Sequence, residues 1–348
     1  MIITTRTPAR AGLIGNPSDG YFGRTIAFSV RNFAARITLY ESPELEIKFH
    51  RNDQLMFRSM RQLVEDIRFS GYYGGIRLIK AAIKKFYEYC QEKSIELEEK
   101  NFTVSYDSNV PLRVGLAGSS AIISSAMKAL MQFYDVEIDK PILANLVLSV
   151  ETDELGINAG LQDRVAQIFE DIVYMDFNRA HMEEYGYGVY EYLSPEVLPN
   201  FYIAYSDDLS EGTEVFHDNI RQRYDDGDQQ VHEAMQEFAG IAASFKDALQ
   251  EGDLPEMHEL INRNFNLRAS IYKLSQRNWE LINCARNVGA SSKFCGSGGA
   301  IVGIYTDEIM YQRLESEMKK IRASLIKPII FEEDDDDIDN LEKEGEDK

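Results

Sequence analysis

The sequence VPLRVGLAGSSA, residues 110–121, lies between a predicted strand at 102–106 and a predicted helix that runs from about Ser119 to Tyr134. Glycines let a backbone approach an anion closely, and the free N–H groups of a first helical turn point towards it. No Lys follows the second glycine, so this is not a Walker A loop. Ser119 or Ser120 could bind Mg²⁺, or either could simply cap the helix. The segment alone therefore leaves phosphate binding and an ordinary helix start both open.

Two further segments are rich in glycine. KFCGSGGA, residues 293–300, precedes a predicted strand and is typical of a backbone that passes close to a ligand or another loop, although a glycine-rich bulge would also fit. TPARAGLIGNPSDGYFG, residues 7–23, places Arg10 before and Asp19 after the apolar stretch AGLIG. Polar residues beside such a turn-rich segment commonly line a cleft, but residues 16–20 could equally be two structural turns.

Glu151 and Asp163 form a candidate pair of carboxylates. One continuous helix would place them about 18 Å apart. Gly156 and Gly160 lie between them, so we expect the helix to break and the chain to return. One carboxylate could then hold Mg²⁺ while the other orients or deprotonates a hydroxyl. Spacing alone favours two unrelated surface acids among the 58 Asp and Glu of the chain.

The pattern of apolar residues predicts an α+β fold, because strands and helices mix without regular alternation. We expect the domain boundary between residues 178 and 200. Further strands are predicted at 2–6, 33–40, 45–49, 172–177, 200–205, 300–305 and 326–331. Further helices are predicted at 74–92, 141–154, 228–250, 254–274, 278–287 and 308–323.

The composition favours a soluble protein of the reducing cytoplasm. There are only three cysteines, with no close pair, and no apolar run of about 18 residues that could span a membrane. The net charge is −21, of which residues 332–348 contribute −9 through eleven Asp or Glu and two Lys. We therefore expect neither nucleic acid nor a membrane as a partner. Residues 332–348 are predicted to be a disordered acidic tail, either an interaction tail or a solubilising extension.

Taken together and in this order, the three glycine-rich segments resemble the motifs of the GHMP kinases, a family named for galactokinase, homoserine, mevalonate and phosphomevalonate kinases. TPARAGLIGNPSD resembles the first motif, PLRVGLAGSSA the second and KFCGSGGA the third, and the resemblance covers most of residues 1–330. Within the family, GNPSDGYFGRTIAFS, GINAGLQDRVAQ, YMDF and SKFCGSGG resemble the glucuronokinases.

The resemblance implies a fold of two domains with the active site between them. Residues 1–185 would form a ribosomal-S5-like N-terminal domain, and residues 186–331 a ferredoxin-like α+β C-terminal domain. The ATP phosphates would bind the loop of Gly115, Leu116, Ala117, Gly118, Ser119 and Ser120. The third motif would shape the cleft through Gly296, Ser297 and Gly298.

The resemblance also implies the chemistry of the site. Asp163 would accept the proton of the attacking hydroxyl, with Arg10 as its partner cation. Ser120 (or Ser119) and Glu151 would hold Mg²⁺, and ATP would be the co-substrate. The oligomeric state is left open.

The expected substrate is a sugar acid, most specifically D-glucuronate, phosphorylated at its anomeric hydroxyl to glucuronate 1-phosphate. Asp19 and Asn16 occupy positions that contact the sugar in the family. Galactokinase has Glu-His where this chain has Asn16-Pro17, which argues against galactose. Mevalonate kinase has Lys where this chain has Arg10, which favours a sugar.

An acidic sugar also needs a cation for its carboxylate, and arginine is the natural bidentate partner. The candidates in or near the motifs are Arg24, Arg31, Arg113 and Arg164. Two alternatives to a glucuronokinase stay open: a GHMP kinase for galacturonate, arabinose or a heptose, and a catalytically silent protein of the same fold that senses a sugar or nucleotide.

Overall fold

The first sheet is built around one long antiparallel pair of strands, β1 (Ile2–Ile14) and β2 (Arg24–Ser42). The computed structural model describes residues 1–48, 74–206 and 218–332. The six-stranded sheet has the order β3-β4-β2-β5-β6, and β1 also pairs with β2. Its other members are β3 (Glu46–Ile47), β4 (Asn101–Ser108), β5 (Ile172–Asp176) and β6 (Val189–Tyr192).

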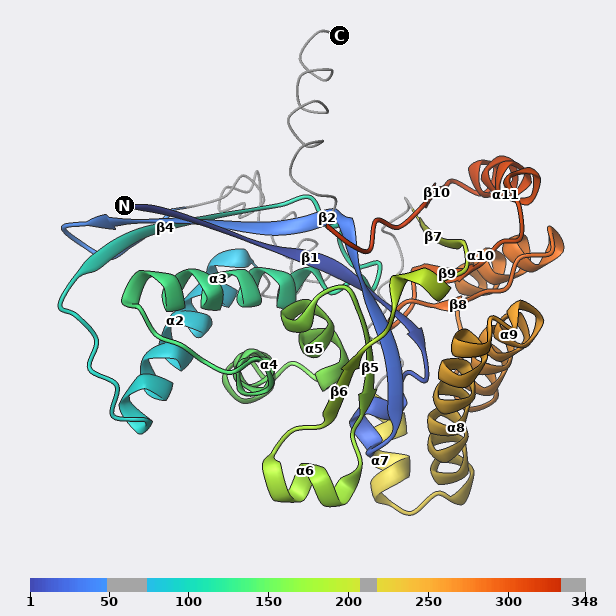
Figure 1. The fold of residues 1–348 in the computed structure, drawn as a ribbon, viewed down its shortest axis with the longest axis horizontal. Helices are drawn as coiled ribbons and strands as arrows, with labels where there is room; N and C mark the ends of the chain where they lie inside the picture. Colours follow the sequence, from blue (N-terminus) through green and yellow to red (C-terminus); the bar gives the residue numbers. More distant parts are fainter. Residues whose placement is uncertain (49–73, 207–217, 333–348) are drawn as a thin grey trace, which may run out of the picture.

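Four helices pack beside this sheet, and Figure 1 shows α3, α4 and α5 lying on one side of β1 and β2. They are α2 (Gly75–Glu92), α3 (Gly118–Tyr134), α4 (Lys140–Ser149) and α5 (Leu161–Phe169). In α2 the buried residues Leu78, Ile79, Ala82 and Phe86 recur every three or four positions, the period of an amphipathic helix. Helices α3 and α5 pack directly on β1 and β2, whereas α2 packs mainly on α3 and α4 mainly on α5.

The second half of the chain forms a four-stranded sheet with the order β10-β7-β9-β8. Its strands are β7 (Phe201–Ser206), β8 (Lys293–Phe294), β9 (Ala300–Ile304) and β10 (Ala323–Ile326). The long helices here are α8 (Gln229–Glu251), α9 (Leu254–Ile271), α10 (Gln276–Asn287) and α11 (Glu308–Lys320). Short elements are η1 (Ser18–Tyr21), η2 (Val150–Glu154), α6 (Arg179–Tyr185), η3 (Pro195–Val197) and α7 (Asp218–Asp225).

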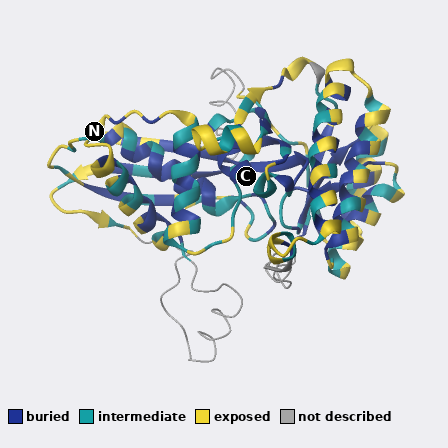
Figure 2. Cartoon of the chain, turned by 90° about the horizontal axis from the view of Figure 1, so that it is seen from below, coloured by how far each residue is buried: buried dark blue, intermediate teal, exposed yellow. Residues whose placement is uncertain are grey.

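An apolar cluster joins the two halves. It combines Leu13 and Phe28 of the first sheet with Phe245 and Ile261 of α8 and α9. The Phe28 ring stacks on Phe201 of β7, with ring centroids 5.4 Å apart. Figure 2 shows buried residues continuing from one half into the other. Burial of this shared surface fixes the relative position of the glycine-rich segments.

The predicted α+β class is confirmed, and most predicted elements lie where the structure has them. One prediction was wrong: the last strand is β10 at Ala323–Ile326, not 326–331. Pro328 follows it and has no N–H for a strand ladder. The predicted strand at 45–49 is reduced to β3, with residue 49 outside the described residues, as is the acidic segment after residue 332.

The predicted division at residue 185 stays a prediction, but the first sheet continues beyond it. Strand β6 pairs antiparallel with β5, from Val173 opposite Tyr192 to Asp176 opposite Val189. Of the helices in the described part of the chain, none combines the length and the apolar character needed to cross a membrane.

Candidate active site

Arg10 and Asp163 form a bidentate ion pair at the centre of the candidate site. Arg10 lies in β1, and its Nε donates to Asp163 Oδ1 at 2.6 Å while its Nη2 donates to Oδ2 at 2.5 Å. The side chain of Arg10 is 5% exposed and that of Asp163 is 20% exposed. Two parallel bonds between a guanidinium and a carboxylate fix both position and orientation. The carboxylate keeps an accessible side towards solvent.

Arg10 also connects the three glycine-rich segments. Its Nη1 donates to the carbonyl oxygens of Gly115 at 2.7 Å and Cys295 at 3.1 Å. The backbone makes matching contacts, because Arg10 N donates to Leu116 O at 3.2 Å and Gly12 N to Cys295 O at 2.8 Å. The three segments that resemble family motifs are therefore brought together around one buried cation.

The second and third segments pack backbone against backbone. Gly115 has φ 75°, and a Cβ there would lie 2.9 Å from Gly298 O. A Cβ on Gly296 would lie 2.5 Å from Gly115 O. Any side chain at Gly115 or Gly296 would push the two loops apart, which is the physical reason for their glycines.

Helix α3 begins at Gly118, after Ala117 with φ 60° in the left-handed region. Gln167 Nε2 donates to Ala117 O at 2.8 Å and so ties this loop to α5. Ser120 is 1% exposed and its hydroxyl donates to Ala117 O at 3.3 Å, whereas Ser119 is half-buried. The positive end of the α3 dipole is thus presented next to the glycine loop, where it favours an anion.

Glu151 lies in η2, a π-helical turn that continues α4, and the predicted helix break follows at residues 155–160, before α5. It forms an ion pair with Arg164, whose Nε donates to Glu151 Oε2 at 2.7 Å and whose Nη2 donates to the same oxygen. Arg164 Nη1 donates to Gly160 O at 2.9 Å, at the start of α5. Arg164 Nη1 also lies 3.5 Å from Asp163 Oδ2, so Arg164 links Glu151 to Asp163, and the predicted return of the chain is observed.

The charges in this cluster set the ionisation of Asp163. Burial alone would raise the pKa of Asp163, but the positive charges of Arg10 and then Arg164 outweigh it, and the pKa is lowered. Asp163 is therefore ionised at neutral pH and can accept a hydrogen bond.

Asp19 lies in η1 beside the start of α5. Its Oδ2 accepts a hydrogen bond from Gln162 N at 3.3 Å, and a Cβ on Gly160 would lie 2.1 Å from that oxygen. Burial, followed by the negative charge of Asp163, raises the pKa of Asp19 to about 6. The predicted sugar contact thus faces the Arg10–Asp163 pair.

Asn16 is buried and already bonded. Its Oδ1 accepts a hydrogen bond from Lys293 Nζ at 2.5 Å, and its O accepts one from Asn264 Nδ2 at 3.4 Å. Its predicted contact with sugar stays a prediction, and in this structure its side chain holds the first and third segments together.

Sequence reasoning missed two buried cations, Lys293 and Arg268. Lys293 opens the third glycine-rich segment, but nothing in the pattern marked it as buried. Arg268 lies on the buried face of α9, with Asn264, Phe265 and Ile271. A charged residue at buried positions of an amphipathic helix was the available signal.

The arginines first considered for the substrate carboxylate have other partners. Arg24 pairs with Asp176, Arg31 with Glu170 and Asp171, and Arg164 with Glu151. Arg113 lies two residues before Gly115, with φ 62°.

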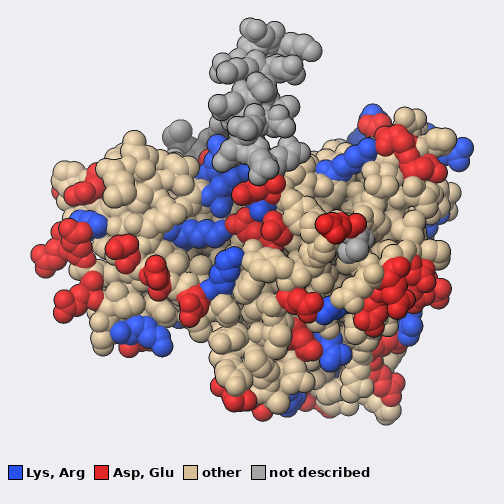
Figure 3. Space-filling view, viewed as in Figure 1, with Lys and Arg blue, Asp and Glu red and all other residues tan. Residues whose placement is uncertain are grey.

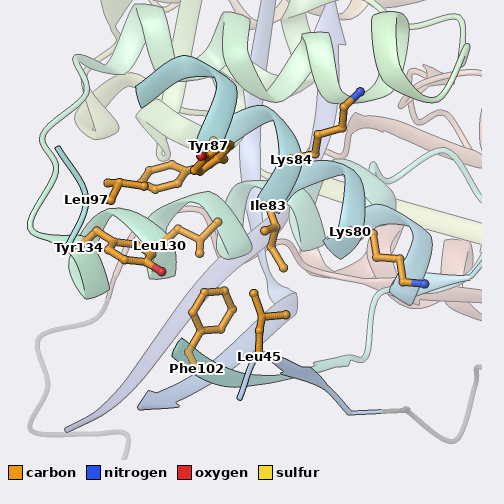
Figure 4. A pocket seen from close by; sticks show the side chains of 10 residues that line it. Leu45, Lys80, Ile83, Lys84, Tyr87, Leu97, Phe102, Leu130 and Tyr134 are labelled. Carbon is orange, nitrogen blue, oxygen red and sulfur yellow. The ribbon is translucent and has the colours of Figure 1, made fainter. Parts of the chain in front are cut away.

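The described residues also form an apolar pocket of about 300 Å³, shown in Figure 4. Phe102, Leu130 and Tyr134 line it together with residues of α2. Tyr134 ends α3, roughly 20 Å along the helix from Ser120. The pocket is therefore separate from the Arg10–Asp163 pair.

Figure 3 shows that acidic and basic side chains are interspersed over the face seen in Figure 1. The expected lack of nucleic-acid partners stays a prediction.

A hydroxyl and a carboxylate suit Mg²⁺, which is commonly held by one or two protein oxygens together with substrate phosphates and water. Among the described residues no group of three His, Cys, Asp or Glu could hold a metal by itself. The predicted Mg²⁺ site at Ser120 and Glu151 stays a prediction: Ser120 lies in the first turn of α3, and Glu151 is ion-paired with Arg164.

The fold and site define a small-molecule kinase of one family. Residues 77–171 match the model of the GHMP kinases N-terminal domain and residues 245–322 the GHMP kinases C-terminal model. The phosphomevalonate kinase of Streptococcus pneumoniae superposes with a TM-score of 0.72 at 15% identity, over 95% of this chain and 100% of that chain. The chain belongs to the GHMP kinases.

Two similar proteins come from Arabidopsis thaliana. Probable glucuronokinase 2 is 42% identical over 331 residues, which is 93% of this chain and 90% of the relative. Glucuronokinase 1 is also 42% identical over 331 residues, covering 93% of this chain and 91% of the relative. The predicted family is confirmed.

Proposed function

We propose that this protein is an ATP-dependent kinase that phosphorylates the anomeric hydroxyl of D-glucuronate and releases glucuronate 1-phosphate. The observation that carries the proposal is the bidentate Arg10–Asp163 pair, which contacts the glycine loop at Gly115. The 42% identity to two glucuronokinases over 93% of the chain supports the substrate.

The phosphate loop supplies positioning and charge. Phosphoryl transfer needs reactants held in line and a developing negative charge that is stabilised. The loop from Gly115 to Ser120 offers backbone N–H groups and the N-terminus of α3. Gly115 and Gly296 let the second and third loops approach without side chains between them. The γ-phosphate of ATP would bind at this junction, next to Arg10.

Asp163 would act on the attacking hydroxyl. An ionised carboxylate accepts the hydroxyl hydrogen bond and takes the proton as the new oxygen–phosphorus bond forms. Arg10 holds that carboxylate in one orientation and prevents rotation. Asp19, on the other side of the α5 start, would accept hydrogen bonds from sugar hydroxyls.

Ser120 and Glu151 would hold Mg²⁺ with the ATP phosphates. When bound, the metal supplies positive charge that offsets the phosphate charge. Arg164 contacts a single oxygen of Glu151, Oε2, and keeps the carboxylate fixed at the start of α5. A cytoplasmic location stays a prediction.

The test is ADP release from Mg-ATP with a panel of acceptors: D-glucuronate, galacturonate, galactose, arabinose, a heptose and mevalonate. Turnover selective for D-glucuronate is expected. Preference for another sugar would support the kinase activity but contradict D-glucuronate as the substrate. No turnover with any member would favour the silent sensing alternative.

A further inference from the structure

Arg268 is a buried cation on α9 that faces the site from the second half of the chain. The residue is 3% exposed. Its Nη1 donates to Gly296 O at 2.9 Å, within the third glycine-rich segment. Gly296 is also where an added Cβ would lie 3.1 Å from Arg10 Nη2. Arg268 is thus connected to the active site through one backbone carbonyl.

Arg268 forms no ion pair with a carboxylate in the described part of the chain. A guanidinium has five N–H donors, and burial without a counter-ion is costly. The buried Nε of Arg268 has no hydrogen-bond acceptor. Its guanidinium carbon lies 4.9 Å from the Tyr272 ring centroid and 5.4 Å from that of Phe294. The guanidinium of Arg268 is therefore packed against two aromatic rings and bonded to one carbonyl oxygen, and it keeps N–H donors that have no acceptor.

The surroundings of Arg268 point to the sugar side of the site. Arg268 and Tyr272 both interact electrostatically with Asp19, the predicted sugar contact. Burial lowers the pKa of Arg268, and the negative charge of Asp19 opposes that effect. An acidic sugar bound between these residues would donate hydrogen bonds from its hydroxyls to the carboxylate of Asp19. The carboxylate of the sugar would bind the guanidinium of Arg268.

The other cations nearby are less suited. Lys293 uses all three of its donors, on Gly12 O, Asn16 Oδ1 and Phe294 O. Arg221 is exposed, and it donates to Gly20 O at 2.8 Å. Neither combines burial with an unpartnered donor.

We propose that Arg268 binds the carboxylate of the acidic sugar and so determines specificity for a sugar acid over a neutral sugar. This inference rests on the proposed function. Within a buried site a guanidinium–carboxylate pair replaces the solvation that each charge loses, whereas a neutral sugar would leave the Arg268 charge uncompensated.

The test compares D-glucuronate with D-glucuronamide, in which an amide replaces the carboxylate. In the Arg268→Gln protein, kcat/KM for D-glucuronate should fall roughly 10- to 150-fold, mainly through KM, because a hydrogen bond to a charged group is lost. The value for D-glucuronamide should change less than about threefold, and KM for ATP should not change. Arg286→Gln is the matched control, because Arg286 is half-buried over Phe265 and bonded to Asn266.

The outcomes separate the two claims. If the wild-type protein ignores D-glucuronate, the proposed function fails and this inference fails with it. If the wild-type protein uses D-glucuronate and Arg268→Gln keeps its kcat/KM within threefold, or loses both substrates equally, only the inference is overturned. If circular dichroism shows that Arg268→Gln does not fold, Arg268→Lys replaces it, because lysine keeps the charge but loses the planar fork of arginine. The ratio of kcat/KM for D-glucuronate to kcat/KM for D-glucuronamide is then compared with that of the wild type.

Discussion

Arg10 and Asp163 are 153 positions apart in the sequence, yet their side chains meet through two parallel hydrogen bonds. Arg10 comes from the first strand and Asp163 from the first turn of α5. The pair exists only when α5 is packed on β1, so the geometry of the proposed catalytic pair depends on the folding of the N-terminal half.

Asp163→Asn should lower kcat by about 10²–10⁴, because an amide cannot accept the proton of the attacking hydroxyl. Binding of ATP should persist, since the phosphate loop does not include this residue. Steady-state kinetics and a nucleotide-binding titration measure the two effects. Asp247→Asn, at an exposed position of α8, is the control. A near-normal kcat in Asp163→Asn would remove Asp163 from the mechanism.

Arg10→Gln should move the acid limb of the kcat/KM profile to higher pH. Burial raises the pKa of Asp163 and the charge of Arg10 lowers it, so loss of that charge lets the pKa rise. Arg10→Lys keeps one charge without the fork and should shift the limb less. The pH profile of each variant checks the order. An unshifted limb in Arg10→Gln would show that Asp163 does not control this part of the profile.

Asp19→Asn should weaken sugar binding but stabilise the protein at neutral pH. The folded-state pKa of Asp19 is about 6, above its ordinary 3.8, so the folded state binds this proton more tightly. Asp19 therefore contributes stability below about pH 4 that is lost as the pH rises towards 6.

Urea unfolding of Asp19→Asn and the wild type at pH 4 and pH 7.5 measures this effect. The difference in free energy of unfolding between the variant and the wild type should be about 1–2 kcal/mol more favourable to the variant at pH 7.5 than at pH 4, after allowance for partial exposure. Its kcat/KM for the sugar should fall about tenfold or more. An equal stability difference at both pH values would contradict the raised pKa.

Gly296→Ala should reduce both stability and kcat, because its Cβ would lie 2.5 Å from Gly115 O and force the two loops apart. We expect a loss of about 1–3 kcal/mol in the free energy of unfolding. Gly240→Ala is matched to it, because a Cβ on Gly240 in α8 meets nothing within 4 Å. Gly240→Ala should be neutral or stabilising by up to about 1 kcal/mol. Chemical denaturation and kcat of both proteins test the contrast.

Local patterns predicted the parts of the site that are defined by short segments. The strand–glycine–helix order around Gly118 and the helix break between Glu151 and Asp163 both follow from residues close in sequence. The extent of β1 was underestimated, because AGLIG was interpreted as part of a turn-rich segment although its residues Ala11–Ile14 lie in a buried strand. Pairing with β2 over its whole length supplies hydrogen bonds that no local pattern indicates.

The buried cations could not be predicted in the same way. Lys293 donates to Gly12 O, 281 positions away, and Arg268 reaches the site from a helix outside every motif. The surroundings of both residues follow from tertiary packing, which places carbonyl oxygens or aromatic rings around their charges. Taken alone, a Lys or Arg in a sequence is more typical of an exposed position.

Proton-coupled ³¹P NMR of a reaction containing the protein, Mg-ATP and D-glucuronate tests the proposed kinase activity most directly. We expect equal amounts of ADP and a new phosphate monoester, whose phosphorus signal is split by the anomeric proton of the sugar. Phosphate on another hydroxyl, ATP hydrolysis to inorganic phosphate, or unchanged ATP would contradict this expectation.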